Sequence, residues 1–295
     1  MQTASPAPSK LGLGTAQFGL DNPSSSQRGR SPEKEAADSL VIAARAGVAV
    51  LDAAVSFAGA EAALGRNMPR PNSFRVIAKT VRPDKGPDFV EAEARASLTR
   101  LGLQSADAIL VQSAGDLFGH HGAAMWDRLK KMKDEGLFAR IGVSAFASDD
   151  PVGLARRFKP DIIQVPASLL DQRLIVSGAL TEMRSLGVEI HLRSIFLQGL
   201  LFLPPDRVPA ALKGASGRLS RVRRIIAEGR SDPLQAALGF ALSRQEAATV
   251  IVGVASAAEL QAVLAAAASP PPDLDWDDMA LDDETALDPR SWVAA

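Results

Sequence analysis

Two oppositely charged residues at the ends of predicted β-strands are the first candidates for chemistry. Asp52 ends the apolar run Val48–Asp52, and Lys79 falls near the end of the run Arg75–Thr80. A carboxylate and an ammonium that meet at one edge of a sheet can orient a polar ligand or assist proton transfer. The alternative is a buried ion pair that only stabilises the fold. Desolvation makes such pairs seldom favourable on balance, so we favour a ligand role.

The residue types that are missing restrict the chemistry further. The chain has no cysteine and no tyrosine. This excludes disulfides, thiolate nucleophiles and cysteine-ligated metals, and it leaves no phenol to act as an acid. The three histidines are His120, His121 and His191, of which the first two are expected in a loop. No metal site is predicted from them.

Composition indicates a globular chain of one large or two small domains. Lys and Arg number 33 against 34 Asp and Glu, so the formal net charge is -1 and no global field favours nucleic acid or an anionic membrane. No apolar run reaches the roughly 18 residues of a membrane span, and no charged-then-apolar leader is found. We therefore expect a cytoplasmic protein.

Short apolar runs of β type alternate with longer segments of helical periodicity. The predicted strands are Leu11–Gln17, Val48–Asp52, Arg75–Thr80, Ala106–Gln112, Phe138–Ser144, Asp161–Val165, Glu189–Leu192 and Thr249–Gly253. The predicted helices include Glu33–Gly47, Pro87–Leu101, Gly122–Asp134, Asp171–Leu186, Pro233–Ser243 and Ala257–Ala267. Eight such alternations favour an α/β fold of the (β/α)8 TIM-barrel type. The alternative is a Rossmann-type open sheet, which is disfavoured because no strand is followed by G-x-G-x-x-G.

Two segments interrupt this alternation, so we expect one barrel over residues 1–268 and a separate tail over 269–295. Residues 193–232 form a long loop after the seventh strand, where loops of a barrel lie over its mouth. This loop carries Arg218, Arg221, Arg223 and Arg224, which could bind a phosphate or an acidic partner or could be a solvated helical face. The tail is acidic and begins with prolines, and we expect an extended appendage outside the core.

Eight segments in fixed order resemble those of one known family. They are LGLGTAQFGL (11–20), LDAAVSFAGAEAALG (51–65), VIAKT (76–80), AILVQS (108–113), IGVSAF (141–146), IIQVPASLLDQR (162–173), LRSIFLQGLL (192–201) and VIVGVASAAEL (250–260). In order and spacing they resemble the aldo-keto reductase family. The resemblance implies a (β/α)8 barrel of the aldo-keto reductase type that binds a nicotinamide dinucleotide across its mouth, but it does not imply catalysis.

The same resemblance implies that the catalytic set is incomplete. Reductases of the family use Asp, Tyr, Lys and His at the mouth, with the tyrosine as general acid. Asp52 and Lys79 match this pattern, whereas Phe57 stands at the tyrosine position and Gln112 at the histidine position. We expect Asp52 to hold Lys79 charged, so that Lys79 is a poor substitute acid. The four positions are therefore interpreted as vestigial, with no catalytic residue.

Positions that hold the cofactor in the family are largely retained. The residues expected to bind it are Asp52, Lys79, Gln112, Ser144, Gln164, Arg193, Ser194, Phe196, Gln198, Gly199, Gly253 and Glu259. Glu259 falls where an arginine or glutamine is usual and would repel a 2′-phosphate, so NAD(H) is favoured over the phosphorylated form. The alternative for Glu259 is an exposed residue in the first turn of a helix.

A barrel that keeps the dinucleotide cleft and lacks the acid predicts a regulatory or sensor protein, a pseudoenzyme. A finer resemblance, to an NADH-binding regulator of bacterial cell division, implies two partners, the division protein FtsZ and the histidine kinase DivJ. The end Ala294-Ala295 resembles a recognition tag for the protease ClpXP, or it is only a frayed end. Two alternatives remain. One is a slow NAD-dependent oxidoreductase that reduces a sugar-like carbonyl, and the other is a scaffold that binds through its arginines or its acidic tail.

Overall fold

Eight parallel strands close into a barrel in the computed structural model, which describes residues 10–19, 32–56, 59–204 and 207–293. The sheet closes because β1 pairs with β8, Leu11 lying opposite Val250 and Gly14 opposite Gly253. The predicted TIM barrel is therefore confirmed, and the open Rossmann-type alternative is wrong. The strands are β1 (Leu11–Gly14), β2 (Val50–Asp52), β3 (Arg75–Lys79), β4 (Ala106–Val111), β5 (Phe138–Ser144), β6 (Ile162–Pro166), β7 (Glu189–Arg193) and β8 (Ala247–Gly253).

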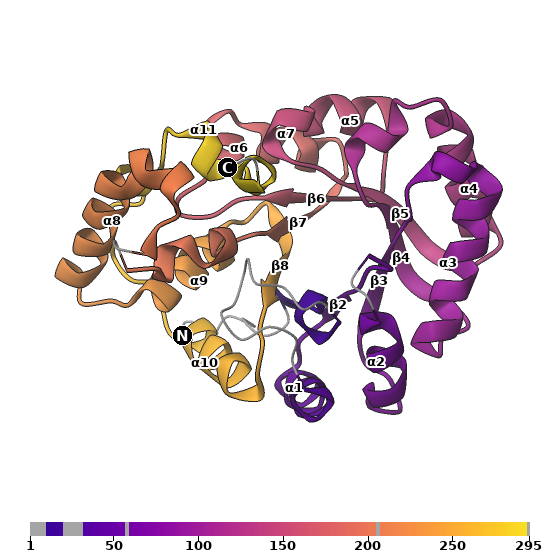
Figure 1. Ribbon diagram of the computed structural model, residues 1–295, viewed down its shortest axis with the longest axis horizontal. Helices are drawn as coiled ribbons and strands as arrows, with labels where there is room; N and C mark the ends of the chain where they lie inside the picture. The colour runs from indigo at the N-terminus through magenta and orange to yellow at the C-terminus, as the bar shows by residue number, and fades with distance from the viewer. Residues whose placement is uncertain (1–9, 20–31, 57–58, 205–206, 294–295) are drawn as a thin grey trace.

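Helices surround the strands, as Figure 1 shows. In the described residues they are α1 (Glu33–Ala46), α2 (Ala60–Asn67), α3 (Pro87–Leu101), α4 (Gly122–Asp134), α5 (Pro151–Phe158), α6 (Arg173–Val176), α7 (Ala179–Ser185), α8 (Ser216–Glu228), α9 (Pro233–Ser243), α10 (Ala257–Ala268) and α11 (Glu284–Leu287). Gly47 ends α1 and Gly102 ends α3, each in the left-handed conformation that favours glycine.

One predicted helix is divided. The expected helix Asp171–Leu186 is wrong as a single element, since α6 and α7 occupy this range. Gly178, between them, has φ 74°, which a continuing right-handed helix cannot contain.

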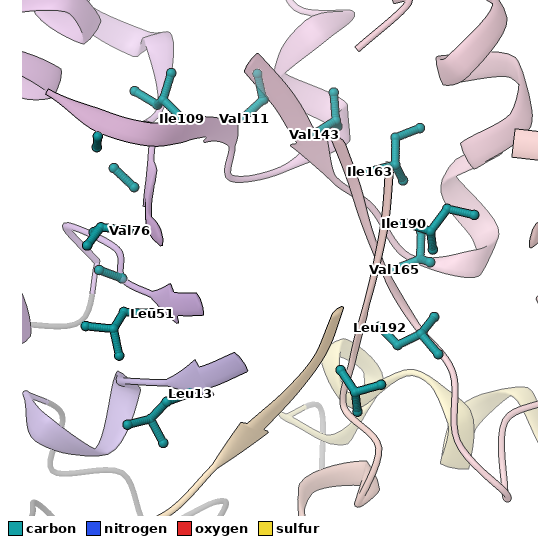
Figure 2. Close-up of a cluster of buried hydrophobic side chains, with 14 of the residues drawn as sticks. Leu13, Leu51, Val76, Ile109, Val111, Val143, Ile163, Val165, Ile190 and Leu192 are labelled. Atoms are coloured by element: carbon teal, nitrogen blue, oxygen red, sulfur yellow. The ribbon is translucent and has the colours of Figure 1, made fainter. Parts of the chain in front are cut away.

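Alternating strand residues face opposite sides of the barrel wall. Figure 2 shows one set, including Leu51, Val143, Ile163 and Leu192, pointing away from the strands, and these residues belong to the main buried cluster together with residues of the surrounding helices. The neighbours of these residues in each strand therefore face inward. The inward set includes a small separate cluster of Val50, Ile77, Ala108, Leu110 and Ile162.

The C-terminal segment is part of the folded molecule. Met279, Leu281, Ala286 and Leu287 are buried in a second apolar cluster with residues of α8 and α9. The Leu281 amide donates to the Leu170 carbonyl at 2.8 Å, and Figure 1 shows the yellow end of the chain against α6 and β6. The expected appendage outside the core is therefore wrong for the part of the segment that carries these four buried residues. The expectation relied on the acidic composition of the segment and overlooked its apolar residues, which anchor it to the core.

Among the described residues, no helix has the length and apolar character needed to cross a membrane.

Candidate functional site at the barrel mouth

A cavity of about 650 Å³ opens at the carboxyl ends of the strands. Most of the predicted polar positions lie at strand ends: Asp52 closes β2, Lys79 closes β3 and Ser144 closes β5. The twelve residues expected to bind a cofactor all line this cavity: Asp52, Lys79, Gln112, Ser144, Gln164, Arg193, Ser194, Phe196, Gln198, Gly199, Gly253 and Glu259. The structure thus brings together residues that are up to two hundred positions apart in the chain.

Strand alternation explains why these side chains converge. Leu51, Val143, Ile163 and Leu192 point outward, so the residue that follows each of them, Asp52, Ser144, Gln164 and Arg193, points inward. Inward residues nearer the amino end of each strand fill the barrel interior, and inward residues at the carboxyl end line the mouth.

Asp52 is the centre of a buried hydrogen-bond network. The Lys79 ammonium lies 2.6 Å from Asp52 Oδ2, and both side chains are almost fully buried. The Gln164 amide nitrogen donates to Asp52 Oδ1 at 3.1 Å. Asp52 is therefore held from two sides, by a charge and by a neutral donor.

Burial and a neighbouring charge act in opposite directions on the pKa of Lys79. Burial lowers the pKa of Lys79 below its ordinary value, although the adjacent Asp52 carboxylate acts in the opposite direction. Removal from water is the larger of the two influences on this pKa, and the expectation that Asp52 holds Lys79 charged stays a prediction.

Three amide oxygens of residues that line this cavity have unused hydrogen-bonding capacity. Gln112 Oε1 and Gln164 Oε1 are buried and accept no hydrogen bond from any described residue. An unpaired buried oxygen is costly, and a ligand that carries an amide N–H could satisfy it. Gln17 Oε1 is in the same condition and lines the same cavity.

The loop that follows β7 adopts an unusual backbone conformation. Ser194, Leu197 and Gln198 have φ values of 58°, 44° and 54°, in the left-handed region that residues other than glycine rarely occupy. Strained backbone in non-glycine residues persists only where the surrounding structure enforces it. Such residues are common at binding sites. Ser194 and Gln198 line the cavity together with Arg193, Phe196 and Gly199.

Carboxylates occupy the N-terminus of α10. Glu259 Oε2 accepts from the Ala255 amide at 2.8 Å, and Glu35 Oε2, from α1, accepts from the Ala257 amide at 2.8 Å. The Ser256 hydroxyl caps the helix by accepting from the Glu259 amide at 3.2 Å. The amides of Ala255, Ala257 and Glu259, which a phosphate could otherwise use, are therefore already engaged.

Several lining residues were not predicted. Thr15, Gln17 and Phe146 line the cavity, and Glu35 was not singled out at the α10 terminus. Gln17 and Phe146 lie within the motifs 11–20 and 141–146, so their motif membership was the available signal. Glu35 carries no such signal, because only the packing of α1 beside α10 brings it there.

The three histidines do not line this cavity. Phe57 lies outside the described residues. His191 is fully buried and its Nε2 donates to Glu189 at 2.8 Å, while the His120 and His121 rings pack against each other at 4.6 Å. No group of metal-binding side chains is found among the described residues.

Three of the four arginines of the α8 cluster make contacts within the chain, and Arg224 is exposed. Arg218 donates to the Ala280 carbonyl at 3.1 Å, Arg221 pairs with Asp278, and Arg223 donates to the carbonyls of Leu200, Leu201 and Leu203. For Arg218 and Arg221, the acidic partner is the chain's own C-terminal segment.

Fold and site together define a (β/α)8 barrel with a polar cavity at its mouth, and comparison with known proteins gives the family. The aldo/keto reductase family model matches residues 10–281, so the chain belongs to this family. It is 35% identical over 127 residues to an aldo-keto reductase of Mycolicibacterium smegmatis, covering 41% of this chain and 44% of that protein. It is 36% identical over 129 residues to an aldo-keto reductase of Mycobacterium sp. (strain MCS), with the same coverage.

The alignments thus span less than half the length of these relatives. A solved structure, the holo form of the aldo-keto reductase AKR11C1 from Bacillus halodurans, superimposes with a TM-score of 0.72 at 19% identity, covering 92% of this chain and 89% of that one. At this identity the likeness supports the fold.

Proposed function

We propose that this protein binds NAD(H) in the mouth cavity and acts as a regulator or sensor without efficient catalysis. The observation that carries the proposal is the convergence of twelve family-type binding positions on one cavity in a chain that has no tyrosine. Residues that would bind the cofactor are therefore retained, while the general acid of the family is missing.

The polar groups of the cavity suit a nicotinamide. Gln164 is oriented by its hydrogen bond to Asp52, and its Oε1 remains available to accept from a carboxamide N–H. Gly253 allows the Gln17 side chain to pack closely on the cavity wall, since a Cβ there would lie 2.9 Å from Gln17. A bound nicotinamide would supply hydride chemistry, and the chain would supply binding and orientation.

The N-terminus of α10 supports NAD(H) over NADP(H). Glu35 and Glu259 place two carboxylates at this helix end, and both already accept hydrogen bonds from backbone amides. A 2′-phosphate would be repelled by these carboxylates and would compete with them for the same donors.

A finer resemblance suggests a biological role. The chain resembles KidO, an NADH-binding oxidoreductase-like regulator of bacterial cell division. On this basis we propose inhibition of FtsZ and of the histidine kinase DivJ, in the cytoplasm. Recognition by ClpXP through Ala294-Ala295 is part of the same proposal, and these two residues lie outside the described residues.

Calorimetric titration tests the dinucleotide proposal. NADH is expected to bind the full chain, and Gln164→Leu, which removes the oriented amide, is expected to weaken binding about 10-fold or more. Gln245→Leu, an exposed glutamine away from the cavity, is the matched control and should leave the affinity unchanged. Absence of NADH binding at millimolar concentration would contradict the proposal.

The alternative function is a slow NAD-dependent oxidoreductase that reduces a sugar-like carbonyl, and the retained Asp52–Lys79 pair favours it.

Phe57→Tyr restores the phenol of the family pattern. This variant is expected to raise NADH oxidation by roughly 10²-fold, the lower end of the effect of a general acid. The alternative instead requires steady NADH oxidation with some aldehyde by the unmodified chain, abolished by Lys79→Met. Such turnover would favour the enzyme over the regulator.

A further inference from the structure

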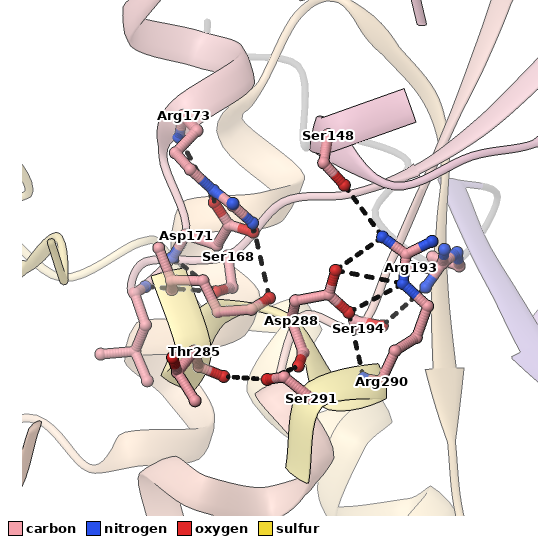
Figure 3. A network of polar contacts seen from close by, with 12 residues as sticks. Ser148, Ser168, Asp171, Arg173, Arg193, Ser194, Thr285, Asp288, Arg290 and Ser291 are labelled. Carbon is pink, nitrogen blue, oxygen red and sulfur yellow. Dashed lines mark hydrogen bonds and ion pairs between the residues drawn. The ribbon is translucent and has the colours of Figure 1, made fainter. Parts of the chain in front are cut away.

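The last described residues of the chain lie close to the mouth of the barrel. The C-terminal segment, residues 277–293, is anchored by buried apolar side chains that include Met279 and Leu287. Beyond this anchor the chain runs to Arg290, which lies beside the carboxyl ends of β5 and β7 (Figure 3). The segment is therefore fixed at one end by apolar packing and at the other by polar contacts.

Arg290 is held by a set of acceptors and by an aromatic ring. Its guanidinium donates to Asp288 at 2.6 Å, to Ser148 Oγ at 2.9 Å and to Asp149 at 3.3 Å. Its Cζ lies 3.9 Å from the centroid of the Phe146 ring. Asp149 is itself fixed, because it accepts from the Phe146 amide at 2.8 Å. The segment thus docks on the turn that follows β5.

The same ring is contacted from the cavity. Arg193 lines the mouth, donates to the Ala145 carbonyl at 3.0 Å and has its Cζ 4.2 Å from the Phe146 centroid. Its Nε is buried and donates to no described residue. One aromatic side chain therefore joins an arginine of the cavity to an arginine of the C-terminal segment.

A second cavity also connects the mouth to the C-terminal segment. A smaller cavity of about 210 Å³ has Arg290 and Asp149 in its wall, and it shares Gln112, Ser144 and Phe146 with the main cavity. A ligand in the main cavity is consequently separated from the C-terminal segment by a single layer of side chains.

Arg193 and Arg290 carry like charges, so a charged ligand in the mouth cavity changes the electrostatic interaction between them. Burial lowers the pKa of Arg193 to about 10; Asp52, Asp149 and Asp288 oppose this effect, and Arg290 adds to it through repulsion. A dinucleotide brings a negatively charged pyrophosphate into the cavity that Arg193 lines. Negative charge there offsets the repulsion that Arg290 experiences from Arg193.

We propose that the C-terminal segment is a clasp that docks more tightly when a dinucleotide occupies the mouth. The inference rests on the proposed dinucleotide binding and adds its regulation, since occupancy would change a surface formed by residues 284–293. Linkage requires the converse as well: docking of Arg290 increases dinucleotide affinity by the same factor.

Hydrogen exchange of the full chain, measured with and without saturating NADH, tests the clasp. NADH is expected to slow amide exchange of residues 284–293 by about 5-fold, the lower end of usual coupling strengths. Arg290→Ala is expected to remove this protection and to weaken NADH binding by a similar factor in calorimetry. Circular dichroism verifies that the variant is folded.

Arg221→Ala provides the matched control. It removes another arginine that pairs with the same segment, at Asp278, but Arg221 lines neither cavity. This variant should keep both the NADH affinity and the NADH-dependent protection. NADH binding with unchanged exchange of residues 284–293 would overturn the clasp alone, whereas absence of NADH binding would overturn the proposed function together with the clasp.

Discussion

At the scale of single residues, the mouth combines one strongly held group with several that lack partners. Asp52 is satisfied by Lys79 and Gln164, whereas the buried amide oxygens of Gln112 and Gln164 accept no hydrogen bond from the described residues. The fixed Asp52 carboxylate can therefore orient Lys79 and Gln164, and Gln164 keeps an amide oxygen that can accept a hydrogen bond from a ligand.

Glu259 gives a prediction about nucleotide choice. Glu259→Arg replaces a carboxylate at the α10 N-terminus by a guanidinium that can pair with a 2′-phosphate. We expect the ratio of NADPH to NADH affinity to rise about 10-fold, the effect of one charge-assisted hydrogen bond.

Fluorescence titration with both nucleotides measures this ratio. Glu228→Arg makes the same charge change on the exposed face of α8 and should leave the ratio as it is. An unchanged ratio in Glu259→Arg would show that this helix end does not contact the adenosine ribose.

At the scale of elements, the C-terminal segment and α8 stabilise each other. The buried face of α8, with Leu219, Val222 and Ile226, shares its apolar cluster with Met279 and Leu287. Its arginines bind the segment from the side, through Ala280 and Asp278. The acidic residues of the segment therefore serve orientation, and its apolar residues supply the stabilisation.

Leu287→Ala tests this packing. Leu287 is 1% exposed, so the substitution leaves a cavity and is expected to lower the free energy of unfolding by about 2 kcal/mol or more. Urea denaturation measures the change. Val176→Ala, at a residue that is 81% exposed, should have almost no effect. Equal stability of both variants would mean that the segment is not docked in solution.

At the scale of the whole molecule, the end of the barrel opposite the mouth is closed by charged residues. Arg75 and Arg140 both pair with Glu189, at 2.7 and 2.6 Å, and both also contact Asp107. His191 adds a further hydrogen bond to Glu189. The network joins β3, β4, β5 and β7, so it contributes to the closure of the sheet.

Acid stability follows from this network. Burial alone would raise the pKa of Glu189, but hydrogen bonds from His191 and Arg75 and the charge of Arg140 lower it to about 2. A carboxyl pKa that is lower in the folded than in the unfolded state stabilises the fold above the unfolded value, and this contribution is lost as the pH falls from about 4.5 toward 2.

Glu189→Gln is expected to be less stable than the unmodified chain at pH 7, by on the order of 3 kcal/mol. The difference between the two should shrink as the pH falls below about 4.5. Urea denaturation at a series of pH values provides the measurement, with Glu228→Gln as an exposed control. A stability difference that stays constant with pH would contradict the lowered pKa of Glu189 in the folded protein.

The sequence determined the barrel and the identity of the mouth residues. Period-two strands, helix-ending glycines and the motifs around Asp52, Lys79 and Ser144 are local signals, and eight of them in order specify one closed sheet. Because strand ends of a parallel barrel meet at one face, the convergence of these residues followed from the topology.

Contacts between distant segments were decided only by the tertiary structure. Glu35 at the end of α10, and Arg290 on the ring of Phe146, join residues more than a hundred positions apart. The state of Lys79 likewise depends on how completely the barrel excludes water from it. Neither the reach of a side chain across a fold nor the depth of its burial is encoded in the residues next to it, since both arise from packing of the whole chain.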